Sequence, residues 1–460
     1  MIFSSLIFIY AFLPLSILIY YIVPKGFRNK VMLCLSVIFC GIQGFNFLVF
    51  MAAYTLLHFA EGILLGKIRQ KKIISYTILA AVILADIIIL LIFREKLFIN
   101  DYVPEIFVPI GISFSTLSAI GYCLDVCRGK IRAEKNFFRF SLYMLFFPKL
   151  PMGPIINYSS FRRMTKYRTM GINEIGAGMV VFVKGLAKKI LFADNIYILY
   201  AAVMGININE LSAISAVLGV IAYGLCLYFT LSGLSDMGAG LARCFGFRLP
   251  QSFNYPISSR GLGEFSSRWH MTVTGWFSRY ILKPLKQKSS SRILESLAVI
   301  FIWSILGLWY DLRLNTLIGG FLIGAVIAAE KFIFTKKNSS FTSMIYTFFV
   351  ISLCTVFFMW DTPIHSLKYL LVIVGGNNSI IDPASIYLLK VFIVVLLICL
   401  YGATDIFRNI VERSGKKWIK VLSNIVTPIT TLILLILCTA EISYTGASEM
   451  TLPILGGAVI

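Results

Sequence analysis

The sequence is short of acidic residues and of histidine. It has 21 Asp and Glu against 42 Lys and Arg, a net charge of +21, and only 3 His in 460 residues. In a soluble protein this imbalance would suggest nucleic-acid binding. Membrane proteins, however, accumulate Lys and Arg in their cytoplasmic loops. Because long apolar runs accompany the charge, we predict no nucleic-acid partner.

Cysteine is present, but the spacings of a structural site are missing. The 9 cysteines include no C-x-x-C pair, and most fall in apolar runs, where Cys behaves as a small hydrophobe. Cys123 and Cys127 lie one helical turn apart, yet the sequence places no His or further Cys near them. We therefore predict neither a disulfide framework nor a metal site.

Processing signals and repeats are missing as well. The first residues, MIFSSLIFIYAFLPLSILIYYIV, contain neither a basic n-region nor a small-residue cleavage site, so we interpret them as a retained first span. We find no internal repeat, no low-complexity segment and no separate soluble domain. The expectation is one integral-membrane domain over residues 1–460.

Long apolar runs are what the chain has in abundance. It is 58% hydrophobic with a mean hydropathy of +0.86, too apolar for a soluble domain. With about 20 apolar residues needed for each span, we expect an all-α polytopic protein of about ten or eleven transmembrane helices, with re-entrant and interfacial helices. The spans are predicted at 1–23, 31–66 (a hairpin broken near 41–44), 73–93, 108–127, 174–204, 211–232, 293–310, 315–335, 341–360, 384–404 and 424–445.

Loop charges predict the orientation of these spans. The basic segments 67–72, 128–135 and 405–420 should be cytoplasmic, with the N-terminus and residues 361–383 outside. Residues 137–161 contain three prolines, which remove backbone donors. Irregular backbone at membrane depth must be covered by protein or water, so we expect a re-entrant or broken element there.

The most polar part of the chain is Phe253–Tyr280, FNYPISSRGLGEFSSRWHMTVTGWFSRY. It carries His270, and imidazole is the side chain best placed to move protons near neutral pH. The alternative is a His that only hydrogen-bonds a neighbouring helix. His365 falls in a predicted outer loop and should meet solvent, whereas Asp86 lies in an apolar span, where we expect a structural partner.

Five segments carry a resemblance to a known family. They are PIGISFSTLSAIGYCLDVCRGKI (109–131), FFPKLPMGPI (146–155), SGLSDMGAGLARCFGFRLPQSFNYP (232–256), EFSSRWHMTVTGWF (264–277) and LGLWY (306–310). In this order they resemble the membrane-bound O-acyltransferase family, in its alginate O-acetylation branch. The resemblance implies the family's all-α membrane fold, with the motifs concentrated in 109–310.

The resemblance also implies a set of site residues, with one departure. The family carries its catalytic His directly after Gly-Leu-Trp, where this sequence has Tyr310. Ionising a phenol at neutral pH costs about 4 kcal/mol, so Tyr310 cannot replace that His as a base, although it can donate a hydrogen bond. The upstream motif has also changed, with Thr230 for an acid and Leu234 for an aromatic residue. The residues implied are His270, Tyr310 and Asp236 for catalysis, and Asn254, Arg268, Trp269, Trp309 and Ser232 for substrate binding; we expect His270 and Asp236 to line a cavity open to the cytoplasm.

The implied function is transfer of an acyl group across a bacterial cytoplasmic membrane. The donor would be cytosolic acetyl-CoA, attracted by a basic inner face, with no metal. An extracytoplasmic, hydrolase-like acyltransferase partner would then modify an envelope polysaccharide. The alternative is a catalytically degenerate relative that acts as a scaffold or conduit in a polysaccharide export or modification complex. A secondary transporter is disfavoured because no repeat symmetry is visible.

Overall fold

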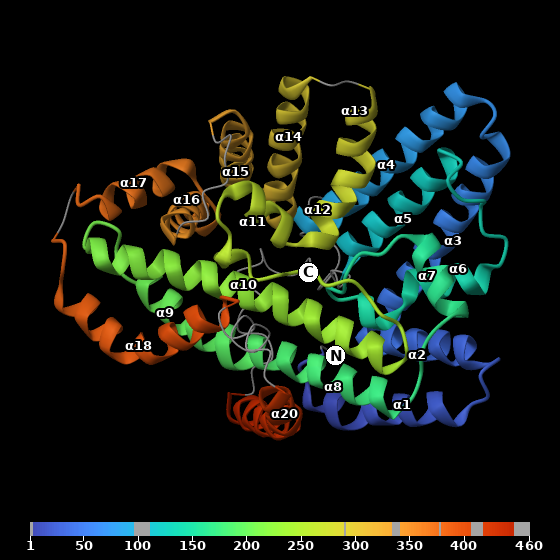
Figure 1. Ribbon diagram of the computed structural model, residues 1–460. Helices are drawn as coiled ribbons and strands as arrows, with labels where there is room; N and C mark the ends of the chain where they lie inside the picture. The colour runs from blue at the N-terminus through green and yellow to red at the C-terminus, as the bar shows by residue number, and fades with distance from the viewer. Residues whose placement is uncertain are drawn as a thin grey trace. The chain divides into compact units, whose positions relative to one another are not determined.

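The computed structural model describes residues 3–95, 111–288, 291–333, 341–376, 379–405 and 417–445. These residues form helices and connecting segments, with no strand among them, which confirms the all-α prediction (Figure 1). They divide into two compact units. The first contains the described residues of Met1–Gly185 and Leu234–Gln251, and the second contains Leu186–Gly233 and the described residues from Ser252 onward.

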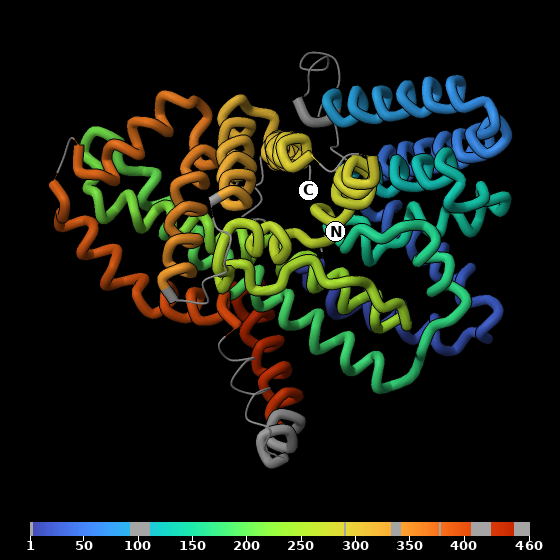
Figure 2. Tube along the Cα trace, turned by 45° about the horizontal axis from the view of Figure 1, so that its top comes forward, coloured from blue at the N-terminus to red at the C-terminus, as the bar shows by residue number. Residues whose placement is uncertain are grey.

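The helices of the first unit come from the N-terminal part of the chain. They are a π-helix η1 (Phe8–Phe12), α1 (Leu13–Ile22), α2 (Arg28–Gln43), α3 (Phe45–Ile68), α4 (Lys72–Glu95), α5 (Ile112–Cys127), α6 (Phe137–Leu145), a 3-10 turn η2 (Phe147–Lys149), α7 (Tyr158–Lys166) and α8 (Ile172–Ala187). Helices α3, α4 and α5 pack against one another and are drawn in blue to cyan (Figures 1 and 2).

The second unit continues from the end of α8. Its elements are η3 (Lys188–Asp194), α9 (Asn195–Met204), η4 (Pro256–Ser258), α11 (Leu262–Arg268), α12 (Met271–Phe277), η5 (Ser278–Leu282), α13 (Lys283–Lys288), α14 (Arg292–Tyr310), α15 (Leu314–Ile333), α16 (Phe341–Met359), α17 (Pro363–Ile373), α18 (Pro383–Gly402) and α20 (Lys417–Thr445). The long helix α10 (Ala213–Cys244) has residues in both units, and the last two residues of α8 also belong to the second unit.

Eight of the described helices are long and apolar enough to cross a membrane: α3, α4, α10, α14, α15, α16, α18 and α20. Three shorter apolar helices lie at Phe8–Ile22, Ile112–Cys127 and Pro363–Ile373. The chain is thus a multi-pass membrane protein, as predicted. Among the described residues, fewer than ten helices reach this length because runs that hydropathy treats as one span are shortened or divided, as at 174–204, where η3 separates α8 from α9.

Two predicted breaks are confirmed. Helices α2 and α3 are separated by Gly44, whose φ of +137° is a conformation that favours glycine. Within 137–161, α6 ends at Leu145, and a 3-10 turn with Pro148 follows before α7 begins at Tyr158. The re-entrant path and the sidedness of the loops stay predictions, and most of the loop 405–420 lies outside the described residues.

Two boundaries differ from the prediction. Helix α10 continues to Cys244, 32 residues in all, because its small residues allow helical packing beyond 232. Residues 361–383 are not simply a loop, since Pro363–Ile373 is helical. The Thr362 side chain caps this helix by accepting a hydrogen bond from the backbone N–H of His365. His365 is exposed, as predicted, although it belongs to a helix.

The backbones of helices α14 and α15 approach each other closely. A Cβ placed on Gly307 would lie 2.1 Å from the carbonyl oxygen of Thr316, and one on Gly320 would lie 2.2 Å from that of Trp303. Only glycine permits this approach, which small residues provide in many membrane helix pairs. Gly307 therefore has a packing role in the Gly-Leu-Trp-Tyr sequence that ends at Tyr310.

Candidate functional site

The polar segment around His270 is fixed by its own backbone. The N–H of Asn254 donates to the carbonyl oxygen of Arg268 at 3.0 Å, and the N–H of Met271 donates to that of Ser252 at 2.6 Å. The hydroxyls of Ser252 and Thr272 are 3.2 Å apart. These contacts tie the loop before α11 to the residues that follow α11. Both sides of His270 are therefore anchored within the second unit.

Two residues of this segment have an uncommon backbone conformation. Tyr255 (φ +46°) and His270 (φ +45°) are the non-glycine residues with positive φ among those described. Such conformations cost free energy and cluster at functional sites. The carbonyl of His270 accepts from the N–H groups of Val273 and Thr274 at 2.9 and 3.0 Å, which starts α12. The chain thus turns sharply at the imidazole-bearing residue.

The imidazole of His270 lies among aromatic rings. Its side chain is 5% exposed, with ring centroids 5.0 Å from Phe253 and 6.4 Å from Trp309. Burial lowers the pKa of His270 to about 3, because the apolar surroundings disfavour the charged form. The ring is therefore neutral at physiological pH. It would gain basicity only when water or a ligand enters its surroundings.

Tyr310 pairs with the residue that precedes His270. The indole N–H of Trp269 donates to the Tyr310 hydroxyl oxygen at 3.0 Å. Since an indole can only donate, the phenol oxygen is the acceptor here and its own proton can be donated elsewhere. Trp269 and His270 thus lie against Tyr310 and Trp309, so four of the predicted site residues are brought together.

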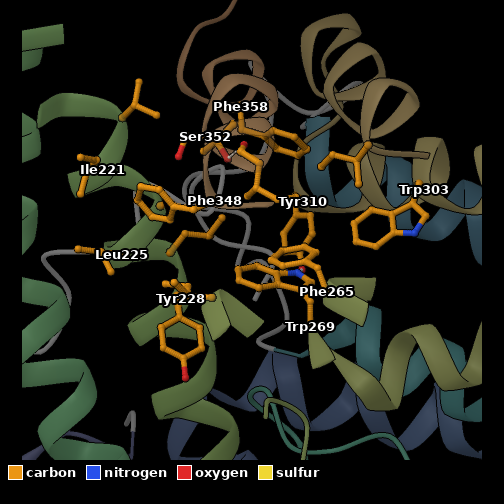
Figure 3. A pocket seen from close by; sticks show the side chains of 17 residues that line it. Ile221, Leu225, Tyr228, Phe265, Trp269, Trp303, Tyr310, Phe348, Ser352 and Phe358 are labelled. Carbon is orange, nitrogen blue, oxygen red and sulfur yellow. Dashed lines mark hydrogen bonds between the residues drawn. The ribbon is translucent and has the colours of Figure 1, made fainter. Parts of the chain in front are cut away.

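A cavity of about 80 Å³ opens beside this pair. Its walls come from α10, η4, α11, α14, α15 and α16 of the second unit, and most of them are apolar. Figure 3 shows Tyr310 near Trp269 and Phe265 on one side and Phe358 on the other. His270 and Asp236 are not among its lining residues. The cavity open to the cytoplasm that is expected for those two residues therefore stays a prediction.

Arg268 has a partner within its own helix. Its guanidinium lies 2.6 Å from the carboxylate of Glu264, whose other oxygen accepts from the backbone N–H of Arg260 at 3.0 Å. The same guanidinium donates to the carbonyl oxygen of Tyr255 at 3.4 Å. Arg268 thus helps to hold the strained loop at Tyr255. A role for Arg268 or half-buried Asn254 in binding a donor remains a prediction.

The two site residues on α10 lie in different units. Ser232 is fully buried in the second unit, two residues after buried Thr230. Asp236 is half-buried and belongs to the first unit. A common site for Asp236 and His270 therefore stays a prediction.

Two lysines are buried, although the sequence did not place Lys149 in a site and favoured a headgroup position for Lys189. Lys149, in the FFPKLPMGPI segment of the first unit, is 1% exposed, and its ammonium group donates to the carbonyl oxygen of Tyr143 at 2.6 Å. Lys189, in η3 of the second unit, contacts both carboxylate oxygens of Asp194 at 2.6 and 2.8 Å. The sequence offered one signal for each residue. Lys149 lies between two prolines, and Lys189 lies five residues before an acid.

Comparison with known proteins adds to this geometry. The model of the membrane-bound O-acyltransferase family matches residues 130–364, which include all the site residues named above. A probable alginate O-acetylase of Pseudomonas aeruginosa is 30% identical over 348 residues, covering 72% of this chain and 66% of that protein.

Two further relatives carry different names. A peptidoglycan O-acetyltransferase of Helicobacter pylori is 26% identical over 431 residues, covering 82% of this chain and 80% of that protein. A teichoic acid D-alanyltransferase of Bacillus subtilis is 24% identical over 250 residues, covering 50% and 61%. The three names describe O-acetylation of alginate, O-acetylation of peptidoglycan and D-alanylation of teichoic acid.

Proposed function

Because the chain belongs to the membrane-bound O-acyltransferase family, we propose that it is an O-acyltransferase of the bacterial cytoplasmic membrane that serves O-acylation of an envelope polysaccharide. The family match and the envelope polymers in the relatives' names support this proposal. We further propose that the group is acetyl, supplied by cytosolic acetyl-CoA, and that an extracytoplasmic hydrolase-like partner completes its delivery.

The chemistry asks for a proton acceptor and for hydrogen-bond donors. A hydroxyl oxygen attacks the thioester carbonyl, the C–S bond breaks, CoA leaves as the thiolate, and the hydroxyl proton must be taken up. We assign proton uptake to His270, whose buried imidazole is neutral. Tyr310 would donate its phenol proton to the carbonyl oxygen as negative charge develops there, a role that needs no ionised phenol.

The observation that carries this proposal is that the adjacent residues Trp269 and His270 lie against the adjacent residues Trp309 and Tyr310. Trp269 donates to Tyr310 while the ring of His270 lies 6.4 Å from that of Trp309. A substituted position that had lost all use would have no reason to keep an aimed polar contact beside the remaining imidazole. The arrangement favours a site that has been altered.

The donor would reach this site from the basic side of the chain. Lys283, Lys286 and Lys288 follow the site segment directly. Such a cluster attracts an anionic, phosphate-bearing donor from the cytosol. Lys286 is partly neutralised by Glu295, whose carboxylate lies 2.8 Å from its ammonium group. The proposed entry therefore depends most on Lys283 and Lys288.

The proposal is tested in the native host. Chromosomal His270→Ala, Tyr310→Phe and Tyr310→His variants would be compared by the acetate released on saponification of purified envelope polysaccharide. We expect His270→Ala to lower O-acetylation by about 10²–10⁴-fold, with exposed His365→Ala as the matched control. Tyr310→His should restore little, because Thr230 and Leu234 also depart from the family pattern. Full O-acetylation in His270→Ala would overturn the assignment.

A second function is favoured by one observation. The cavity beside Tyr310 is mostly apolar and does not include His270 among its lining residues, as would suit a relative that serves as a scaffold or conduit. In that case deletion of the gene would abolish polymer modification or export, whereas His270→Ala would leave both unchanged at equal protein level. The same set of strains therefore separates the two functions.

A further inference from the structure

A second histidine, His58, lies in a cluster of ligand-type side chains in the first unit. His58 and Glu61 are neighbours on α3, and Cys123 faces them from α5. A ligand atom of each residue lies within 4.8 Å of those of the other two. His58 and Cys123 are fully buried, and Glu61 is 15% exposed. Imidazole, carboxylate and thiolate are the groups that bind transition metals in proteins.

The second nitrogen of the same imidazole has a carboxylate partner. His58 Nε2 lies 3.2 Å from Oδ1 of Asp86 on α4. The hydroxyl of Tyr54 donates to that same oxygen at 2.9 Å and also lies 2.9 Å from the Thr116 hydroxyl. The contact between His58 and Asp86 lacks the angles of a hydrogen bond, but with a metal bound Asp86 would accept from the Nε2–H group and leave Nδ1 available as a ligand. This is the usual support of a metal-binding histidine.

On the other side of the ring, His58 Nδ1 and Glu61 Oε2 also lack a hydrogen bond. His58 Nδ1 lies 2.7 Å from Glu61 Oε2, yet the contact lacks the angles of a hydrogen bond, and both atoms are shielded from solvent. Buried polar atoms without a hydrogen bond are costly, above all inside a membrane span. A cation held between Nδ1 and Oε2 would remove that cost.

We propose that His58 Nδ1, Glu61 Oε2 and Cys123 Sγ bind one divalent transition-metal ion of the Zn²⁺ class. Three mixed N, O and S ligands leave a fourth position of a tetrahedral site for water. The ion displaces two protons, one from the imidazole and one from the thiol, so the cluster with Asp86 carries the same net charge before and after binding. Binding therefore adds no net charge to the apolar helix bundle.

The required movement is small. With metal–ligand bonds of about 2.0–2.3 Å, neighbouring ligand atoms of a tetrahedral site lie roughly 3.3–3.7 Å apart. Nδ1 and Oε2, at 2.7 Å, must separate by less than about 1 Å. Glu61 is the partly exposed member and can make that adjustment. The bound ion would connect α3 to α5 and, through Asp86, to α4.

The test is metal stoichiometry on the full-length protein in detergent, purified without a polyhistidine tag. After loading with Zn²⁺ and passage through metal-free buffer, mass spectrometry should find about one ion per chain in the wild type. Cys123→Ser and Glu61→Gln should lose it. Asp86→Asn should bind about 10–100-fold more weakly, because it removes only the support of the imidazole.

The matched control is Cys127→Ser. Cys127 is also buried on α5, one turn further on, and its sulfur contacts the Ser75 hydroxyl at 3.2 Å. This variant should keep the full metal content, and with Co²⁺ it should keep the thiolate-to-cobalt charge-transfer absorption that Cys123→Ser loses. Each variant is checked for an unchanged monodisperse elution profile. A metal-free wild type, or a Cys123→Ser variant that retains a full equivalent, would overturn the proposal in favour of an imidazolium held between two carboxylates.

Discussion

Two buried histidines in this molecule have opposite surroundings. His58 is fully buried with Glu61 and Asp86 on its two sides. His270 is 5% exposed and lies between the rings of Phe253 and Trp309. The first environment favours a cation, whether a proton or a metal ion, and the second favours a neutral ring. Burial alone therefore does not define a histidine's chemistry, since the groups facing the ring decide which charge state is stable.

The largest effect should come from removing the carboxylate that faces His58. Asp86→Ala leaves the imidazole and the Tyr54 hydroxyl without their partner, and breaking a buried pair typically costs about 3–5 kcal/mol. We expect a large loss of folded protein, measured by fluorescence-detected gel filtration after heating. Asp361→Ala, an exposed site paired with Arg313, should change little. Equal behaviour of the two variants would mean that the carboxylate does not support the His58 cluster.

The His270 site should in turn depend on close helix packing. Gly307→Ala places a methyl group 2.1 Å from the Thr316 carbonyl oxygen, and such overpacking typically costs about 1–3 kcal/mol. The melting temperature in detergent should fall, and the near-ultraviolet signal of Trp309 and its neighbours should change. The control is Gly275→Ala, where nothing lies within 4 Å of the added Cβ. A wild-type melting curve for Gly307→Ala would show that α14 and α15 can separate.

The neutral state of His270 predicts a pH dependence. Because the folded pKa of about 3 lies below the ordinary 6.5, the unfolded chain takes up the proton first as the pH falls. The stabilising contribution is complete above pH 6.5 and is lost between pH 6.5 and 3, at up to about 1.4 kcal/mol per pH unit. His270→Asn should reduce the slope of the unfolding free energy against pH by the amount that one bound proton contributes. Asn is chosen because it tolerates positive φ.

The slope difference between wild type and His270→Asn isolates this one group, since all other titrating groups are shared. Identical slopes from pH 6.5 to 5 would mean that His270 is solvated and titrates normally. The variant Cys123→Ser, which alters the cluster around His58, should leave the contribution of His270 to this slope unchanged.

The smallest effect should come from Tyr310→Phe. It removes the acceptor of the Trp269 indole N–H, and a single hydrogen bond of this kind contributes about 1 kcal/mol. We expect a slight fall in melting temperature and a shift in tryptophan emission. Exposed Tyr387→Phe should show neither change. An unchanged emission spectrum in Tyr310→Phe would indicate that the contact is not maintained in solution.

Much of the fold could be predicted because the lengths of the apolar runs indicate where the membrane-spanning helices lie. Spans such as 341–360 and 384–404 agree closely with Phe341–Met359 and Pro383–Gly402. The break near Gly44 followed from glycine, and the pairing of Asp86 followed from the cost of a carboxylate in a span. Helix α10 was predicted too short because hydropathy ends at the small and polar residues of its second half, which still pack helically.

The candidate site was only partly accessible from sequence. The clustering of His270, Trp269, Trp309 and Tyr310 was implied by family motifs, while the direction of the Trp269 hydrogen bond needed coordinates. The His58 cluster was missed because Cys123 follows His58 by dozens of residues, and spacing rules detect only ligands that are close in sequence. Three-dimensional packing of separate spans leaves no local pattern.

The glycine contact between α14 and α15 also bears on how this protein can diverge. Gly307 and Gly320 hold the two helices by their backbones, so the position of Trp309 and Tyr310 depends little on exposed side chains such as Phe301 and Phe321. Mutations on that outward surface can accumulate with every generation while the aromatic end of α14 keeps its place. Substitutions there should have little effect on the site, whereas a single methyl group on either glycine would push the two helices apart.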